Sequence, residues 1–394
     1  IMHSESKYLL NVLKSFIHNQ PPGSFKGNWK NLIRLAGGHS VTSILGYMVM
    51  NYPDEFNQEY AALLRNQCLE SIGVYSQKAE CMKVLIEQMN EKEIDHLLFK
   101  GFVIRDYYPV PELRTFGDID FLIPMKDREK SDLLMIENGF RRETDWEPVY
   151  SYRKGLEHYE IHTDVMEVDV SLKADYKEYF SHTWERAKAL EGHTYVLSPE
   201  DHLIYMLTHI AKHINGSGAG IRMYLDVAVY LKHFEGKLDC NYLQQEFRKL
   251  AFETFSNMVF SIVQKYFEVD SPIPLQKIEE TTLADFMEFT MAGGTFGGIG
   301  RDAGLDSLKK NALKDGNVSR GKTLRTRLFP AAKTIEKRYT YLQGKPWLLP
   351  IAWVHRFFKT RATWGAHSKE AKSIMSTEKE KVEKLQRLQR EIGL

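Results

Sequence analysis

Residues 97–124 of the chain read LLFKGFVIRDYYPVPELRTFGDIDFLIP, and the rest of the sequence can be arranged around them. An apolar run up to Lys100 is broken by Gly101, and prolines close the segment that follows, which is long enough for about two helical turns. After Gly117, polar and apolar residues alternate and the run then becomes apolar, as in a half-buried strand. The pattern predicts a strand, a short helix, a loop and a second strand.

Asp118 and Asp120 lie two residues apart on the second predicted strand. Residues at this spacing share one face and lie about 6.5–7 Å apart along the strand, so Ile119 and Phe121 should enter the core. Two carboxylates held in this way suit a hard divalent cation such as Mg²⁺. An Asp-x-Asp pattern also occurs by chance in solvated turns, so its neighbours must support this interpretation.

The residues around the acidic pair favour phosphate. Lys100 and Gly101 end the first predicted strand and open a helix, where free N–H groups and a lysine attract an anion. Arg114 lies between the two strands, and its guanidinium can bind two phosphate oxygens at once. The context therefore indicates a site for a metal ion and a phosphorylated ligand.

This combination resembles the minimal, DNA-polymerase-β-like nucleotidyltransferases, and more narrowly the bacterial uncharacterised nucleotidyltransferase group. The pattern of that group is Lys-Gly, a short helix, Tyr-Pro, Arg and then Asp-x-Asp. The chain has all five parts, as Lys100-Gly101, Tyr108-Pro109, Arg114, Asp118 and Asp120. The wider fold usually has Gly-Ser before its helix, and Lys-Gly stands there in this group. The similarity covers residues 90–235.

The resemblance implies Mg²⁺-dependent transfer of an NMP from an NTP to a hydroxyl acceptor, with release of pyrophosphate. Asp118, Asp120 and a third carboxylate would hold two Mg²⁺ ions, with Mn²⁺ as a substitute. Asp169, on a predicted strand over residues 165–172, matches the third position, and Glu167 shares its facing. The implied acceptor is left open between a small molecule, an RNA end and a protein. Residues implied to bind the nucleotide are Lys100, Gly101, Arg114, Gly117 and Arg222.

Three groups of polar residues further along have competing interpretations. His158, Glu160 and His162 alternate on one predicted strand, where a zinc site is less favoured than an exposed or substrate-facing strand. A helix capped by Ser198 carries His209 and His213 without the glutamate of a His-Glu-x-x-His protease motif. The following helix carries Arg222 and Asp226; the resemblance implies that these helices complete the nucleotide site, and a purely structural Arg222–Asp226 pair is the alternative.

The predicted fold class is α+β, with a small mixed β-sheet nucleotidyltransferase core flanked by N-terminal and C-terminal helical bundles. Helical spacing of apolar residues predicts a long helix over 55–89, with Leu63, Leu64 and Val84 among its inward residues, and another over 126–138. A hairpin is expected around Lys154-Gly155. The predicted regions are 1–92 (N-terminal helices), 93–197 (catalytic core), 198–300 (helical bundle) and 301–394 (basic helical region).

Composition favours a soluble protein of a reducing compartment, and we expect a cytoplasmic one. The 394 residues are 43% hydrophobic and 27% charged, which are ordinary globular values. Three scattered cysteines describe neither a disulfide framework nor a zinc site. The sequence shows no signal-peptide pattern and no apolar run of the roughly 20 residues that a membrane span needs.

The net charge of +1 conceals an asymmetry. Residues 301–394 contain 22 basic and 9 acidic side chains, a net charge of +13, which leaves −12 on residues 1–300. Such an asymmetry, together with interleaved aromatics such as Trp347 and Trp353, can mark RNA, another polyanion or a membrane surface as partner; a solvated helical surface is the alternative. The glycine run at 293–300 lacks the Gly-Lys-[Ser/Thr] ending of a P-loop.

Two other functions fit parts of the pattern. In some glycosyltransferases an Asp-x-Asp motif binds Mn²⁺ and a nucleotide-sugar, but an α/β nucleotide domain usually precedes the motif, whereas this N-terminal region reads as helical. A non-catalytic nucleotide-binding or interaction protein on the same fold is the second alternative. The intact set of basic and acidic residues argues against such a loss of activity.

Overall fold

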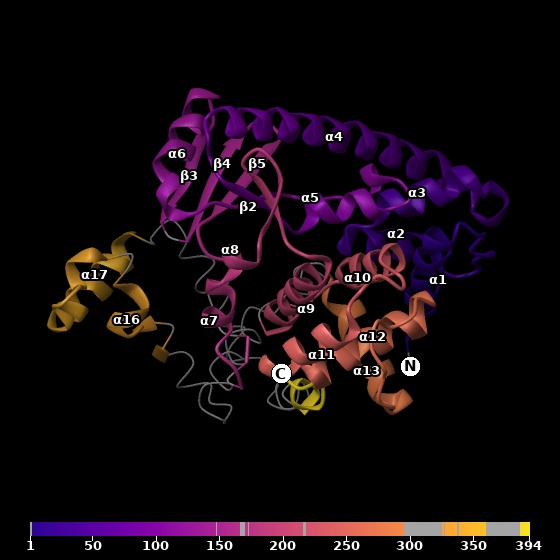
Figure 1. Cartoon of the computed structure of the whole chain (residues 1–394). Coiled ribbons are helices and arrows are strands. Elements are labelled where there is room, and N and C mark those ends of the chain that lie inside the picture. Colours follow the sequence, from indigo (N-terminus) through magenta and orange to yellow (C-terminus); the bar gives the residue numbers. More distant parts are fainter. Residues whose placement is uncertain are drawn as a thin grey trace. The chain divides into compact units, whose positions relative to one another are not determined.

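A computed structural model describes residues 2–146, 148–165, 170–171, 173–215, 218–294, 325–326, 328–336, 339–359 and 387–394 (Figure 1). The chain divides into two units. The first contains residues 1–214, 218–299 and 393–394, and the second contains 215–217 and 300–392.

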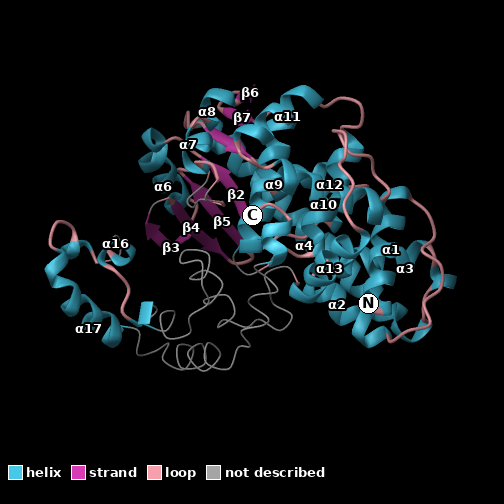
Figure 2. Ribbon diagram, turned by 90° about the horizontal axis from the view of Figure 1, so that it is seen from below, coloured by secondary structure: helices cyan, strands magenta, loops and turns pink. Residues whose placement is uncertain are grey.

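A seven-stranded mixed sheet lies in the first unit (Figure 2). Its strand order is β3-β4-β5-β2-β1-β7-β6, in which β2–β5 and β1–β7 are parallel pairs and the other neighbours are antiparallel. The mixed sheet with its surrounding helices confirms the predicted α+β class. The strands are β1 (His96–Leu98), β2 (Ile119–Leu122), β3 (Arg141–Trp146), β4 (Val149–Lys154), β5 (Glu157–His162), β6 (Lys188–Glu191) and β7 (Thr194–Val196).

The segment at 97–124 has the predicted order of elements. After β1 come the short helix α5 (Gly101–Ile104), the 3₁₀ turns η2 (Arg105–Tyr107) and η3 (Pro111–Leu113), and then β2. Proline fixes its own φ and lacks an N–H, which is why it starts η3 and limits the helix before it. The two strands pair directly with each other, antiparallel, so the loop between them folds back over one end of the sheet.

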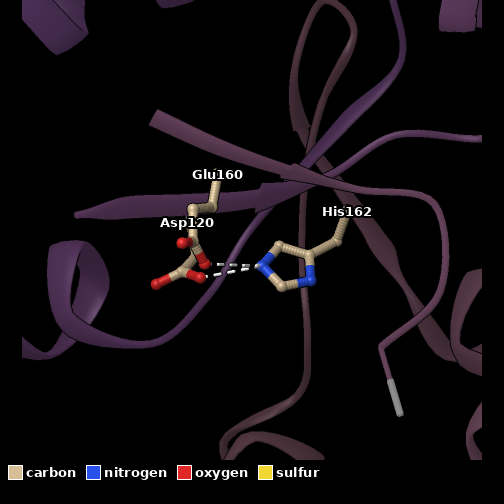
Figure 3. Close-up of side chains that lie close together, drawn as sticks. All are labelled: Asp120, Glu160 and His162. Carbon is tan, nitrogen blue, oxygen red and sulfur yellow. Dashed lines mark hydrogen bonds and ion pairs between the residues drawn. The ribbon is translucent and has the colours of Figure 1, made fainter. Parts of the chain in front are cut away.

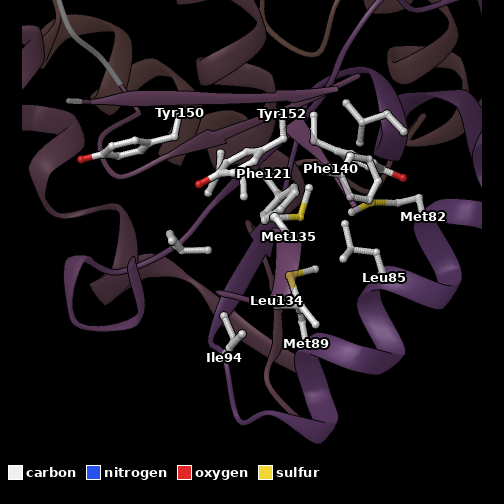
Figure 4. Close-up of a cluster of buried hydrophobic side chains, with 14 of the residues drawn as sticks. Met82, Leu85, Met89, Ile94, Phe121, Leu134, Met135, Phe140, Tyr150 and Tyr152 are labelled. Atoms are coloured by element: carbon white, nitrogen blue, oxygen red, sulfur yellow. The ribbon is translucent and has the colours of Figure 1, made fainter. Parts of the chain in front are cut away.

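One face of the sheet is covered by apolar side chains of two helices, α4 (Gln58–Glu91) and α6 (Arg128–Glu137) (Figure 4). Ile119 and Phe121 of β2 are buried in this cluster, as the alternation predicted. Full burial of such side chains stabilises the fold by roughly 1.5–3 kcal/mol each. Asp120 alternates with them and therefore lies on the opposite face, which leaves that face of β2 for polar chemistry.

The buried side of α4 differs in detail from the expected one. Leu64 is buried as predicted, but Leu63 and Val84 are about half exposed. The inward residues continue through Met82 and Met89, which are buried in the apolar cluster against the sheet. A lysine, Lys78, lies on this buried side.

The predicted hairpin around Lys154-Gly155 is confirmed as the antiparallel pair β4–β5. The expected strand at 165–172 is not observed in its described residues Val165, Val170 and Ser171. Asp169 and Glu167 lie outside the described residues. β2 pairs with β1 on one side and with β5, in parallel, on the other.

The remaining helices of the first unit pack mainly on one another, as α1 does on α2, α3 and α12. Tyr205 of α9 packs edge-on against Phe99, with ring centroids 5.2 Å apart, and so brings α9 to the end of β1. No described helix combines the length and apolar character needed to cross a membrane. These helices are α1 (Ser4–His18), α2 (Trp29–Gly38), α3 (Thr42–Asn51), α7 (Tyr176–Ser181), α8 (Thr183–Arg186), α9 (Pro199–Asn215), α10 (Ile221–His233), α11 (Cys240–Lys249), α12 (Glu253–Phe267) and α13 (Glu280–Gly293).

The described part of the second unit has a small apolar core of its own. Helices α16 (Ala332–Ile335) and α17 (Leu349–Lys359) enclose Tyr339 and other buried side chains. Trp353 donates from Nε1 to the Pro330 carbonyl oxygen at 2.9 Å, whereas Trp347 is 73% exposed. Some aromatic side chains of the basic region are therefore packed in this small core, whereas others are exposed to solvent.

Candidate active site

Asp120 is the centre of a buried polar cluster at the start of β2. Its side chain is almost fully buried, and Oδ1 accepts hydrogen bonds from Lys100 Nζ at 2.6 Å and from His162 Nε2 at 2.8 Å. Lys100 reaches it from the end of β1, and His162 from the end of β5. Three adjacent strands of the sheet thus place one side chain each at the same point.

Glu160 joins this cluster because of the register between β2 and β5. Asp120 pairs with Glu160 and Leu122 with His162 along the two parallel strands. Ligand atoms of Asp120, Glu160 and His162 all lie within 4.8 Å of one another (Figure 3). This spacing allows one cation to contact all three side chains.

The charges in this cluster hold one another ionised. Burial alone would raise the pKa of Asp120, but the Lys100 ammonium and the His162 hydrogen bond bring it well below its usual range. Burial likewise opposes the charge of Lys100, and the carboxylates of Asp120 and Asp118 raise its pKa above the ordinary value. A carboxylate that stays ionised is what a cation ligand requires, and a lysine that stays protonated can bind phosphate.

Lys100 has an unusual backbone conformation. Its φ of 58° and ψ of −141° lie in a region that residues other than glycine rarely adopt. Strain of this kind persists only where surrounding contacts impose it, and it concentrates at functional sites. This backbone conformation lets Lys100 connect the end of β1 to the start of α5 while its Nζ donates to Asp120.

Arg114 is held by Asp226 of α10. Its Nε and Nη2 donate to the two carboxylate oxygens of Asp226 at 3.0 and 2.8 Å, and the Tyr108 hydroxyl donates to Oδ1 at 2.7 Å. Asp226 is therefore shared by two residues of the Lys-Gly…Tyr-Pro…Arg pattern. The partner of Asp226 that the sequence suggested was Arg222, and the structure places Arg114 and Tyr108 there.

Gly101 lies directly under the Arg114 guanidinium. A Cβ built on Gly101 would come within 2.2 Å of Nη1 of Arg114. Because Asp226 fixes this guanidinium from the other side, it cannot easily move away. The glycine of the Lys-Gly pair is thus required by packing.

Arg222 on α10 and two histidines on α9 lie on the helices next to this cluster. Arg222 donates from Nη1 to the Thr115 carbonyl oxygen at 2.8 Å, and its buried Nε has no hydrogen-bond partner among the described residues. Burial first, and then the nearby Arg114 charge, lower the pKa of Arg222. His209 and His213 of α9 lie with their Nε2 atoms 3.1 Å apart, and burial lowers the pKa of both, that of His213 to about 4.

The other residues predicted for the site lie near the Asp120 cluster, outside it, or outside the described residues. Asp118 immediately precedes β2, is partly exposed, and lies near enough to act electrostatically on Lys100. Gly117 is exposed, and Asp169 lies outside the part of the chain that is described. His158 hydrogen-bonds Ser151 Oγ at 2.7 Å and is not part of the three-residue cluster.

The sequence indicated Glu160 and His162 only as two of the three residues on an exposed or substrate-facing strand, with zinc as a weaker alternative, and offered Arg222 as one possible partner of Asp226. The alternation of His158, Glu160 and His162 was a usable signal, since it marks a polar face on the strand after the acidic pair. The missing information was the pairing of β5 beside β2.

The Asp-x-Asp pattern at the start of β2, with Glu160 facing Asp120 from β5 and the Lys100 ammonium beside it, combines carboxylates of the kind that divalent cations take with a charge that attracts phosphate. The family model of the uncharacterised nucleotidyltransferases matches residues 26–268, more than half of the chain. The chain belongs to this family. This membership favours nucleotidyl transfer over the Asp-x-Asp glycosyltransferase alternative.

Other comparisons add little to the family assignment. The solution structure of the antibiotic-resistance factor ANT(2'')-Ia matches 44% of this chain and 92% of its own, with 12% identity and a TM-score of 0.32. The comparison with curated proteins gives no match. The family assignment rests on the family model.

Proposed function

We propose that the protein transfers an NMP from an NTP to a hydroxyl acceptor, with release of pyrophosphate, in a reaction that depends on Mg²⁺. The observation that carries this proposal is the cluster of Asp120, Glu160 and His162 beside the Lys100 ammonium. Membership in a nucleotidyltransferase family supports the reaction class.

The donor set fits a divalent cation. Two carboxylates suit Mg²⁺, and the additional imidazole also admits Mn²⁺. Asp118, Asp120 and Glu160 would hold the ions, with His162 as a further ligand or as the residue that orients Asp120. Asp169, expected from the family pattern, is the alternative third carboxylate. When bound, such ions lower the charge on the phosphates and favour the ionised form of the acceptor hydroxyl.

In the proposed reaction the acceptor oxygen forms a bond to the α-phosphorus, and the bond from that phosphorus to the bridging oxygen of the β-phosphate breaks. The hydroxyl proton passes to a carboxylate, for which Glu160 is the candidate among the described residues. Lys100 remains protonated and offsets the negative charge that grows on pyrophosphate.

The other residues expected to bind the nucleotide would either contact it from the helices or support the site indirectly. Arg222 is the candidate for a direct phosphate contact, because its positive charge lies beside Thr115 in the segment just before Asp118. Arg114 would support the site through Asp226 and through its packing on Gly101. Gly117 would leave the approach to Asp118 open, since a Cβ there would meet no atom within 4 Å.

The experiment that tests this function follows label from each α-³²P-NTP, with Mg²⁺, into total RNA, protein and small metabolites offered separately. Label should enter one of these pools and should be lost in the Asp118→Asn/Asp120→Asn variant. The +13 charge on residues 301–394 makes RNA a natural first pool. Metal-dependent NTP binding without transfer into any pool would favour a non-catalytic nucleotide-binding protein instead.

The third carboxylate can be identified in the same assay. If Glu160 holds the metal, Glu160→Gln should lower the rate at least as much as Asp120→Asn, and Asp169→Asn much less. Mn²⁺ binding measured without nucleotide should show the same order. The reverse order would assign the position to Asp169.

A further inference from the structure

Lys78 is a buried cation that the proposed chemistry does not use. It lies on the inner side of α4 and is 8% exposed. Its ammonium is 5.3 Å from the ring centroid of Tyr75 and 5.4 Å from that of Phe116, so two aromatic faces compensate part of its lost hydration. Because burial of an ammonium is unfavourable, other interactions must compensate for it, and these interactions can indicate what the lysine does.

The hydrogen bonds of Lys78 go to the backbone just before the acidic pair. Its Nζ donates to the Phe116 carbonyl oxygen at 3.3 Å and to the Gly117 carbonyl oxygen at 3.4 Å. The Gly117 carbonyl and the N–H of Asp118 belong to the same peptide unit. A side chain of α4, some forty residues earlier in the chain, therefore contacts the peptide plane from which this aspartate extends.

Two other cations hold the carbonyl one residue earlier. The Thr115 oxygen accepts from Arg222 at 2.8 Å and from Arg114 at 3.3 Å. Three successive carbonyls before Asp118 are thus bound by basic side chains that come from three different parts of the fold. Lys78 holds the two nearest to the aspartate.

Asp118 depends on its backbone for orientation. Within the described part of the chain, no hydrogen bond or ion pair holds its carboxylate. The residue before it, Gly117, has no side chain to restrict the backbone, and a Cβ there would meet open space. Because a peptide unit is planar, fixing the Gly117 carbonyl also fixes the amide of Asp118.

We propose that Lys78 is a positioning residue for Asp118. By donating hydrogen bonds to the Phe116 and Gly117 carbonyl oxygens, Lys78 fixes the backbone from which the Asp118 carboxylate reaches the metal site. This inference rests on the proposed function, since it assumes that Asp118 is a cation ligand. The residue does not touch substrate or metal in this account.

Mn²⁺ affinity without nucleotide tests the proposal, because positioning and plain electrostatics predict opposite signs. Removal of a nearby positive charge would by itself tighten the binding of a cation. Loss of a residue that orients a ligand weakens metal binding, typically by 10-fold or more. Lys78→Met, which keeps the length of the side chain and removes its donors, should therefore weaken Mn²⁺ binding about 10-fold. Its kcat should fall more than its KM for NTP rises.

Lys78→Gln and Lys83→Met complete the design. The glutamine keeps a donor and should recover part of the Mn²⁺ affinity, which a purely structural role would not predict. Lys83, on the same helix, is exposed and pairs with Glu80, so Lys83→Met should leave affinity unchanged. Circular dichroism and Tm establish that each variant is folded.

The outcomes separate this proposal from the function on which it rests. Unchanged or tighter Mn²⁺ binding in folded Lys78→Met would overturn the positioning role and leave the proposed function standing. Unfolding of both Lys78 variants would overturn it too, because Lys78 would then hold the fold. If the wild-type protein binds no Mn²⁺ that depends on Asp118 and Asp120, the proposed function itself fails.

Discussion

The clearest requirement for a single residue in this site is the absence of a side chain at Gly101. Arg114 lies where a Cβ would be, at 2.2 Å from Nη1, and Asp226 holds the same guanidinium by two hydrogen bonds. The glycine, the arginine and the aspartate therefore form one packed unit, although 125 residues separate Gly101 from Asp226 in the sequence.

Gly101→Ala should displace the Arg114 guanidinium and weaken its pair with Asp226. Overpacking of this kind costs about 1–3 kcal/mol, and we expect a lower Tm together with a loss of transfer activity. Urea unfolding and the labelled-NTP assay measure the two effects. Gly73→Ala on α4 is the matched control, because its Cβ would meet nothing and alanine favours a helix. A Gly101→Ala variant as stable and active as the wild type would contradict this packing.

Between elements, a buried polar link joins α10 to the loop before β2. Asp226 is buried and accepts hydrogen bonds from Nε and Nη2 of Arg114 and from the Tyr108 hydroxyl. Burial and the neighbouring Asp226 charge raise the pKa of Tyr108, which favours the protonated hydroxyl as a donor to Asp226.

Asp226→Asn should destabilise the protein by about 3–5 kcal/mol, because it leaves the buried Arg114 charge without its partner. The free energy of unfolding in urea measures this cost. Asp285→Asn, at an exposed position of α13, should change it by less than about 0.5 kcal/mol. Equal stability of the two variants would mean that Arg114 finds another partner.

At the level of elements, the sequence allowed much of the fold to be predicted. The strand, short helix and strand around Lys100 follow from local pattern, and Ser198 caps α9 as expected, with its Oγ accepting from the Asp201 N–H at 3.0 Å. Glycine and proline positions and apolar alternation are local signals, so they can be interpreted without knowledge of the tertiary structure.

The site itself could be predicted only in part, because its remaining partners are set by register and packing. Asp120 meets Glu160 through the pairing of β2 with β5, and Arg114 meets Asp226 through the docking of α10. Neither contact has a local signature, since 40 and 112 residues separate the partners. Lys78 shows the same limit: on a helix of 34 residues, periodicity alone does not distinguish a buried lysine from an exposed one.

For the whole first unit, buried neutral histidines set a lower pH limit for stability. His39 is fully buried, with Nε2 3.1 Å from the Met291 carbonyl oxygen and Nδ1 accepting from the Ile221 N–H at 3.1 Å. Both ring nitrogens are thus engaged in one neutral tautomer, and a proton on Nδ1 would face a donor. Burial lowers the pKa of His39 to about 4, and burial has the same effect on His202.

Acidification below pH 6.5 should therefore destabilise the protein. Between pH 6.5 and pH 4 the unfolded chain binds a proton at His39 that the folded chain does not, so stability is complete above pH 6.5 and falls below it. For one histidine the loss approaches about 3 kcal/mol at the lower end. His39→Gln should give a shallower fall of the urea-unfolding free energy between pH 7 and pH 5. His182→Gln should not, because hydrogen bonds to Glu185 and Glu178 raise the pKa of that exposed ring and its titration acts in the opposite direction. Equal slopes for wild type and His39→Gln would show that His39 is not the group that titrates.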